Sequence, residues 1–205
     1  MANNDDKTTF LYVDASNLYG ALSDVLANGD YIDFSEILTC LEEDFVIHKV
    51  KAYGTFLADE PRSSLNRRRF IRAQNKFFQS IINNSKTEFQ KGYFSSTSKK
   101  EKGIDVRLAV DMVKDAYEGS CKCEIIMTGD DDFIYSIKCV RNIKISVHMA
   151  ALGSRFPFGI AHNTNKRMIY DLYNYFNNSV LPKINKLPVN LKVRNITNKV
   201  NILTV

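Results

Sequence analysis

Short apolar runs alternate along the chain with longer segments in which apolar residues recur at helical spacing. The first run, FLYV at positions 10–13, is bounded by polar residues and is typical of a buried strand. Leu18, Leu22 and Val25 follow at intervals of three or four, which predicts a helix. The same two patterns predict strands at 10–13, 46–56, 87–94, 124–128 and 143–149, and helices at 18–26, 62–83, 104–117, 133–140 and 165–176.

Strands that alternate with helices predict an α/β fold, with a mostly parallel five-stranded sheet covered by helices on both faces. The apolar stripes of the helices indicate which side chains face this core. The stripes are Phe70, Phe77, Phe78, Ile81 and Ile82 in the longest helix, Val106, Ala109, Val110 and Val113 in the next, and Ile134 and Ile137 in the one after.

The pattern changes near position 181. Pro182 and Pro188 interrupt it, and Asn and Lys then alternate with apolar residues to the end. We therefore predict one domain at 8–178 and a C-terminal tail at 179–205. The tail could add an edge strand, wrap the domain or be mobile, and the pattern does not choose among these.

Composition agrees with a folded chain of this kind. The 205 residues are 44% hydrophobic and 25% charged, close to globular averages. The net charge of +5 permits a nucleic-acid partner without requiring one. No apolar run approaches the roughly 20 residues of a membrane span, and the start does not resemble a signal peptide. The four cysteines are too sparse for a disulfide scaffold, which indicates a reducing, cytoplasmic location.

Acidic residues follow the predicted strands. Asp14 ends the first strand, Asp130, Asp131 and Asp132 follow the fourth, and Asp105 begins a helix. Ligands of open parallel sheets lie beyond the carboxyl ends of the strands, so these side chains are expected to converge. Clustered carboxylates repel one another unless a cation is present, and oxygen ligands favour Mg²⁺ or Mn²⁺. The alternative for Asp14, Asp105 and Asp130 is a simple helix N-cap.

Three motifs carry a resemblance to a known family. They are Tyr12-Val-Asp14-Ala-Ser-Asn17-Leu18, Lys102-Gly-Ile-Asp105-Val106 with Asp111, and Thr128-Gly-Asp130-Asp131-Asp132-Phe133. In this order the sequence resembles the NYN domain family, a branch of the PIN-like nucleases, over roughly residues 9–176.

The resemblance implies a PIN-like three-layer sandwich and an Mg²⁺- or Mn²⁺-dependent ribonuclease that leaves a 5′-phosphate and a 3′-hydroxyl. It implies that the catalytic and metal residues are Asp14, Asp105, Asp130 and Asp132, with Asn17, Asp111, Lys102 and Asp131 in supporting roles. One feature departs from the family. Another Asp often begins the last helix, but the segment at 159–168 contains His162, Asn163 and Asn165 and no Asp.

Basic and aromatic residues offer contacts for a nucleic acid. Arg68, Arg72 and Lys76 are spaced four apart and share one face of the long predicted helix, where they could bind RNA phosphates or remain solvated. Lys102 is a candidate for substrate phosphate. Tyr93, Phe94, Phe156 and Phe158 could stack on bases, although we expect core packing for Tyr93 and Phe94.

The sequence thus favours a metal-dependent endoribonuclease acting on RNA, with a single strand as the expected substrate. The alternative is a non-catalytic RNA-binding or regulatory module that keeps the fold. No Walker loop, serine-nucleophile elbow or dinucleotide-binding turn is present. The RNA, the pathway and the oligomeric state, including whether a homodimer forms, are left open.

Overall fold

A computed structural model describes residues 8–59, 62–95, 97, 101–152, 155, 157–165, 167–171, 184–186, 192–195 and 200–202. No helix in these ranges is long and apolar enough to cross a membrane.

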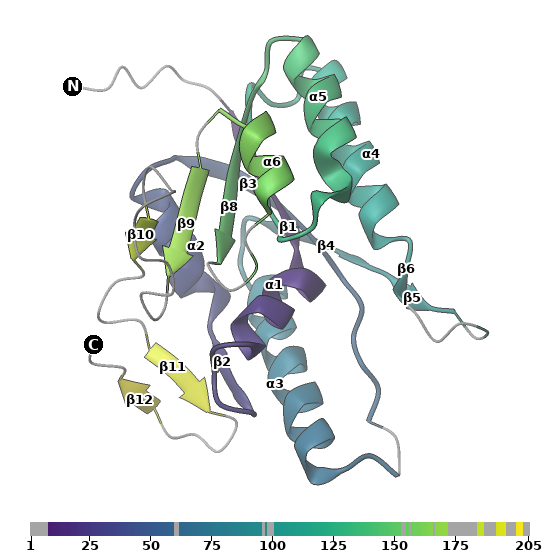
Figure 1. Cartoon of the computed structure of the whole chain (residues 1–205), viewed down its shortest axis with the longest axis vertical. Coiled ribbons are helices and arrows are strands. Elements are labelled where there is room, and N and C mark those ends of the chain that lie inside the picture. The colour runs from purple at the N-terminus through teal and green to yellow at the C-terminus, as the bar shows by residue number, and fades with distance from the viewer. Residues whose placement is uncertain are drawn as a thin grey trace.

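One parallel sheet organises the chain (Figure 1). Strand β1 (Thr9–Asp14) lies in its middle and pairs with β3 on one side and β7 on the other. Every pairing within this sheet is parallel, which places the carboxyl ends of its strands at a common edge. The order is β10 (Ile184–Lys186), β9 (Arg167–Asp171), β8 (Ser146–Leu152), β7 (Cys123–Met127), β1, β3 (Ile47–Gly54), β4 (Thr87–Lys91).

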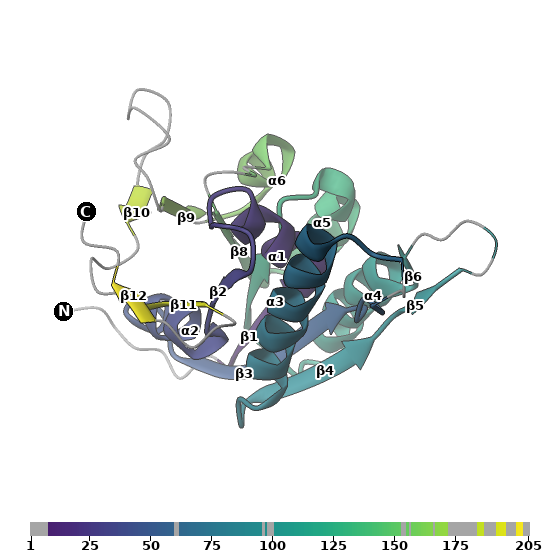
Figure 2. The same cartoon turned by 90° about the horizontal axis from the view of Figure 1, so that it is seen from below.

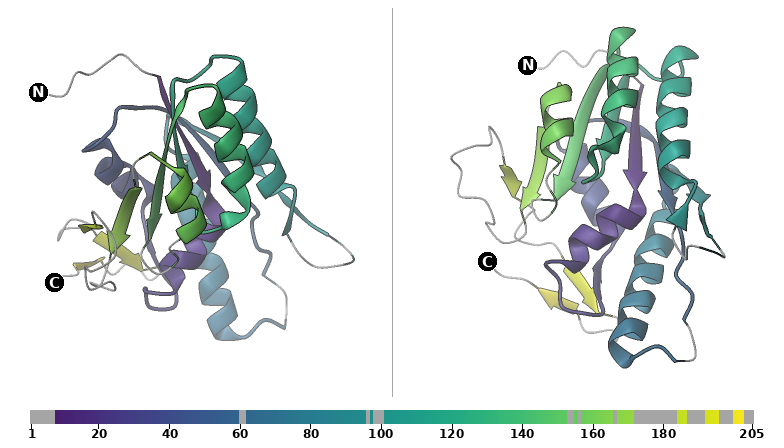
Figure 3. Two further views of the ribbon diagram at one scale, coloured as in Figure 1. Left: turned by 45° about the horizontal axis from the view of Figure 1, so that its top comes forward. Right: turned by 45° about the vertical axis from the view of Figure 1, so that its right-hand side comes forward.

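Side chains alternate between the faces of β1 and so belong to two separate cores. Leu11 and Val13 pack with the first three helices, whereas Phe10 and Tyr12 pack under the later ones. The expected three-layer α/β sandwich is therefore confirmed, and Figure 3 shows α4 and α5 side by side on one face. The helices are α1 (Ala15–Ser23), α2 (Phe34–Glu42) and α3 (Leu65–Ile82) against the first core, and α4 (Ile104–Tyr117), α5 (Ile134–Asn142) and α6 (Phe158–Asn163) against the second.

Two segments differ from the sequence prediction. The predicted helix at 165–176 is wrong at residues 167–171, which form β9 and pair in parallel with β8; the rest of that range lies outside the described residues. Strand β2 (Asp30–Ile32) and helix α2 were not predicted at all. Helix α2 is short, yet Asp33 caps it and Phe34, Ile37 and Leu41 are fully or almost fully buried, so tertiary packing stabilises it.

Helix α4 buries only part of the predicted stripe. Ala109 and Val113 pack partly buried against the second core, but Val106 and Val110 are 72% and 56% exposed. The fully buried side chains are instead Ile104, Leu108 and Met112. Both stripes have helical spacing, so periodicity alone did not distinguish them. The stripe with the longer side chains is the one that fills the second core.

Three short strands lie within the predicted tail. Strand β10 extends the edge of the parallel sheet beside β9. Strand β11 (Lys192–Asn195) pairs with β2 and with β12 (Val200–Ile202), as Figure 2 shows. Thus these described parts of the tail add strands, one of the alternatives that the sequence left open.

A small hairpin precedes α4. Strands β5 (Tyr93–Phe94) and β6 (Glu101–Lys102) pair antiparallel and project from the body of the domain beside the start of α4 (Figure 2). Gly103 then turns the chain into α4 with φ of +83°, a left-handed conformation that L side chains rarely adopt. This turn fixes where the hairpin sits relative to the first residues of α4.

Candidate functional site

Asp14 ends the central strand and begins α1. It continues the alternation of Phe10 and Tyr12, so its side chain emerges on the α4 face of the sheet. The backbone N–H of Asn17 donates to its Oδ1 (3.0 Å), and the hydroxyl of Thr128 donates to its Oδ2 (3.2 Å). Asp14 is therefore a helix N-cap, as the simpler interpretation proposed, but it is also almost fully buried next to the end of β7.

The loop after β7 is tied directly to α1. The side-chain oxygen of Asn17 accepts the N–H of Gly129 (2.8 Å). A Cβ at Gly129 would lie 2.7 Å from the backbone oxygen of Arg155 and 2.9 Å from Asn17 Oδ1, so no side chain fits there. In the structure the Asn17 side-chain oxygen joins the start of α1 to the loop after β7. Its expected supporting role, to orient substrate or a ligand, stays a prediction.

A short 3₁₀ helix, η1 (Asp131–Phe133), follows this loop. Asp130 lies at its N-cap position and Asp132 lies within it. The N–H of Asp130 donates to Thr128 Oγ1 (3.1 Å), and the N–H of Asp132 donates to Asp130 Oδ1 (3.0 Å). Asp130 thus caps η1. Because Thr128 also donates to Asp14, one hydroxyl links the Asp14 carboxylate to the backbone N–H of Asp130.

Asp105 and Glu101 approach from the other side. The N-cap of α4 is Gly103 without a side-chain cap, so the simple cap interpretation does not apply to Asp105, which lies in the first helical turn. Glu101 was not predicted. It lies in the hairpin, and the hydroxyl of Ser16 in α1 donates to its Oε1 (2.9 Å). The sequence signal for Glu101 was weak because it stands in a polar, charged loop.

Electrostatics link these carboxylates. Burial and the charges of Asp105 and Glu101, against the lowering effect of two hydrogen bonds, together raise the pKa of Asp14 to about 7. Burial also raises the pKa of Asp105, together with the charges of Asp130, Glu101 and Asp132. We call these five residues, Asp14, Glu101, Asp105, Asp130 and Asp132, the edge cluster.

The edge cluster fits a hard divalent cation in its chemistry. All donors are carboxylate oxygens, and their mutual repulsion favours a positive ion among them. Within the described ranges, however, no three acidic, histidine or cysteine side chains already stand close enough to hold a metal alone.

Three predicted supporting residues have other contacts. Asp111 accepts a hydrogen bond from the Tyr53 hydroxyl (2.8 Å). Asp131 accepts the N–H groups of Gly159 (3.2 Å) and Ile160 (2.9 Å) and so fixes the start of α6. Lys102 pairs with Tyr93 across the hairpin, on the face opposite Glu101. A contact of Lys102 with substrate phosphate stays a prediction.

The predicted basic face is only partly free. Arg72 and Lys76 are exposed on α3, but Arg68 is half-buried with its Nε 3.6 Å from Asp59. Two residues of the segment 159–168, where family members often carry another Asp, also form hydrogen bonds within the protein. Asn163 Nδ2 donates to the oxygen of Gly159, and Asn165 Oδ1 accepts the N–H of Val147.

The predicted aromatic contacts divide into two groups. Core packing was wrong for Tyr93 and Phe94, which are 64% and 40% exposed on the hairpin. Phe156 lies outside the described residues, and so does the side chain of Phe158.

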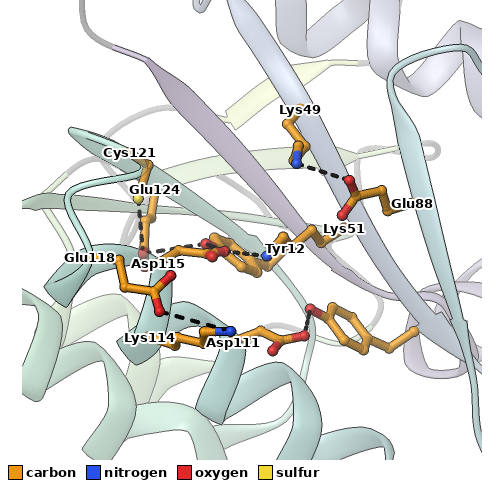
Figure 4. A network of polar contacts seen from close by, with 11 residues as sticks. Tyr12, Lys49, Lys51, Glu88, Asp111, Lys114, Asp115, Glu118, Cys121 and Glu124 are labelled. Carbon is orange, nitrogen blue, oxygen red and sulfur yellow. Dashed lines mark hydrogen bonds and ion pairs between the residues drawn. The ribbon is translucent and has the colours of Figure 1, made fainter.

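A second group of ionisable residues lies under α4 (Figure 4). Asp115 accepts the hydroxyl of Tyr12 (2.8 Å) and forms an ion pair with Lys51. Glu124 is fully buried, and Cys121 donates to its Oε1 (3.3 Å). Burial and the charge of Asp115 raise the pKa of Glu124 to about 8, although hydrogen bonds and Lys51 oppose this. We call Tyr12, Lys51, Asp115, Cys121 and Glu124 the inner network.

Comparisons with known proteins agree with this architecture. The crystal structure of a protein of unknown function, VPA0982, from Vibrio parahaemolyticus superposes with a TM-score of 0.61 at 14% identity, covering 82% of this chain and 96% of that one. That likeness shows a shared fold. No protein with a curated description matches the sequence. The family described as NYN domain matches residues 8–172. The chain therefore belongs to the NYN domain family, within the PIN-like superfamily.

Proposed function

We propose that this protein is a metal-dependent ribonuclease that cleaves RNA phosphodiester bonds at the edge cluster. The observation that carries the proposal is the convergence of carboxylates from different elements on buried Asp14. Asp105 and Glu101 both raise the pKa of Asp14, although α4 and the hairpin are about 90 residues away in the chain. A fold has little structural reason to gather uncompensated charges at one edge, and doing so is unfavourable without a cation.

Asp14, Asp105, Asp130 and Asp132 would hold the cation, with Glu101 beside them. A divalent ion held there would supply polarisation of the phosphodiester and activation of water for attack on phosphorus. The Thr128 hydroxyl and the Asn17 N–H orient the two oxygens of Asp14. The Asn17–Gly129 hydrogen bond keeps the two strand ends in fixed register.

Family membership supports the same reaction class, since the resemblance in sequence implies a Mg²⁺- or Mn²⁺-dependent ribonuclease. The three acidic motifs lie on β1, η1 and the start of α4, at the carboxyl edge of the sheet where ligands bind in parallel α/β folds. The positively charged residues Arg72 and Lys76 are available to an RNA backbone.

Cleavage of a fluorescent single-stranded RNA tests the proposal. We expect Mg²⁺ or Mn²⁺ to support cleavage and EDTA to abolish it. Asp14→Asn should reduce the rate by at least about 100-fold, because Asn keeps the helix cap but removes the charge.

Asp33→Asn is the matched control. Asp33 caps α2 as Asp14 caps α1, through an Oδ1 that accepts the N–H of Ser35. We expect it to retain wild-type cleavage. Wild-type turnover in Asp14→Asn would exclude the proposed role, and metal-independent binding without any cleavage would favour the RNA-binding module.

A further inference from the structure

We propose that the β5–β6 hairpin is a base-stacking arm, and that Phe94 stacks on a nucleobase of single-stranded RNA beside the edge cluster. The inference rests on the proposed function and adds to it the strandedness of the substrate and the residue that recognises it. It starts from the two aromatic side chains of this hairpin, neither of which belongs to a core.

The pairing of the hairpin decides which aromatic ring faces the site. Phe94 pairs with Glu101, and Tyr93 pairs with Lys102. Directly opposed residues of an antiparallel pair project from the same face, whereas neighbours along a strand project from opposite faces. Phe94 therefore shares a face with Glu101, and Tyr93 shares the other face with Lys102.

Glu101 shows where that face points. Its Oε1 accepts a hydrogen bond from the hydroxyl of Ser16, which lies in the first turn of α1. Ser16 lies two residues after Asp14, which caps the same helix. The face that carries Phe94 thus borders the carboxylates, and a base on Phe94 would place its phosphate next to them.

The environment of the ring suits a base better than a protein partner. Phe94 is 40% exposed, so one side is available. A stable protein interface needs about 800 Å² on each partner, which two side chains at the end of a narrow hairpin do not supply. One base needs only one aromatic face, and stacking tolerates any sequence.

A duplex cannot use this arm. Bases in a helix are already stacked on one another, so only an unpaired base can lie on Phe94 without the loss of that stacking. We therefore expect the site to bind single-stranded RNA more tightly than double-stranded RNA, and expect Phe94 to cause this preference.

The test measures affinity without relying on turnover. A labelled 12-nucleotide single-stranded RNA and the same sequence as a duplex are titrated with the protein in Ca²⁺ in place of Mg²⁺, and a gel confirms that the strands remain intact. Phe94→Ala should weaken single-strand binding roughly 5- to 100-fold, the range for loss of one stacked base, and leave duplex binding unchanged. Phe94→Tyr should restore single-strand binding.

Two controls make the outcome specific. Tyr93→Ala changes the neighbouring ring on the opposite face, and Tyr117→Ala changes a tyrosine on α4 with the same exposed fraction, 64%. Both should bind single strands within about twofold of wild type, as exposed substitutions usually change little. Normal binding by Phe94→Ala, or an equal loss in Phe94→Ala and Tyr93→Ala, would overturn the proposal. Asp14→Asn tests cleavage, whereas Phe94→Ala tests affinity. A negative result for one proposal therefore leaves the test of the other proposal valid.

Discussion

The edge cluster and the inner network are both groups of carboxylates, and they differ in what neutralises them. In the inner network the chain supplies its own partners: Lys51 pairs with Asp115, and the hydroxyl of Tyr12 and the thiol of Cys121 donate to the two carboxyl groups. In the edge cluster the influences on Asp14 and Asp105 are burial and further carboxylates, offset at Asp14 by two hydrogen bonds. Among the described residues, Glu124 Oε2 still lacks a hydrogen-bond partner, but the cation and the donors of the inner network come from the chain itself. Carboxylates paired inside the protein are typical of structure, whereas carboxylates gathered at a sheet edge without a cation are typical of a ligand site.

The largest expected change in the free energy of unfolding comes from removal of Lys51, the cation of the inner network. Lys51→Met leaves Asp115 buried without its partner, which should lower the free energy of unfolding by about 3 kcal/mol. Lys49→Met on the same strand breaks only the exposed pair with Glu88 and should cost less than about 1 kcal/mol. Urea unfolding measures both. Equal losses in the two variants would show that the inner network does not depend on its internal cation.

Metal addition should distinguish the two groups next. Mg²⁺ at about 100 times its Kd should stabilise the wild-type protein by about 2.7 kcal/mol, visible as a rise in Tm. Asp132→Asn should be more stable than wild type without metal, because it relieves repulsion, and should respond less to Mg²⁺.

Asp111→Asn is the control for this measurement. Asp111 lies on the same helix as Asp105 but accepts a hydrogen bond from Tyr53, so its variant should keep the Mg²⁺ response. An identical response in Asp132→Asn and wild type would place Asp132 outside the metal site.

The next effect, smaller when counted per pH unit, is the pH dependence of the inner network. The pKa of Glu124 is raised in the folded protein to about 8 from 4.5, so between these values the unfolded chain loses a proton that the folded chain keeps. The free energy of unfolding should therefore fall as pH rises from about 5 to about 8, by up to about 1.4 kcal/mol per pH unit.

Glu124→Gln should flatten the slope of the free energy of unfolding against pH. The difference between the slopes of wild type and variant gives the contribution of Glu124 and leaves out that of Asp14. Unfolding by urea at pH 5.5, 6.5 and 7.5 in EDTA gives the three points. A slope unchanged by Glu124→Gln would mean that Glu124 is already ionised inside the protein.

The smallest expected effect lies outside both groups. Arg72→Ala with Lys76→Ala should leave folding stability and the Mg²⁺ response unchanged, because both side chains are exposed. If they contact phosphates, the slope of log K against log salt for single-stranded RNA should flatten by about 1.4, or about 0.7 for each contact. An unchanged slope would assign this face of α3 to solvent and leave the edge cluster without a basic neighbour there.

Local patterns predicted the parts of the fold that local forces determine. The buried run at Phe10–Val13, the Asp at its end and the helix at 104–117 were all found, because strand burial and helix periodicity can be read within a few residues. Helix α2 and strand β9 were missed because packing and strand pairing decide them. The choice between the two apolar stripes of α4 likewise depended on the sheet beneath it.

The candidate site shows the same limit. Asp14, Asp105 and Asp130 could be placed together because parallel strands end at one edge. Glu101 could not, since its position depends on the pairing of two-residue strands and on a hydrogen bond from Ser16. Asp131 and Asp132 are neighbours in sequence, but only the structure showed that Asp131 fixes α6.

The central position of β1 has a consequence for synthesis of the protein. The strand leaves the ribosome first, yet Thr9 pairs with Cys123 on one side and with Ile47 on the other. At about 5–20 residues per second, the second partner follows on the order of 10 s later. During that interval one edge of a strand that is fully buried in the finished fold has no neighbour, which is a template for aggregation. Pairing with β3 covers only the opposite edge, so the β7 edge of β1 has to be protected, by a chaperone or by the nascent chain itself, until β7 has been made.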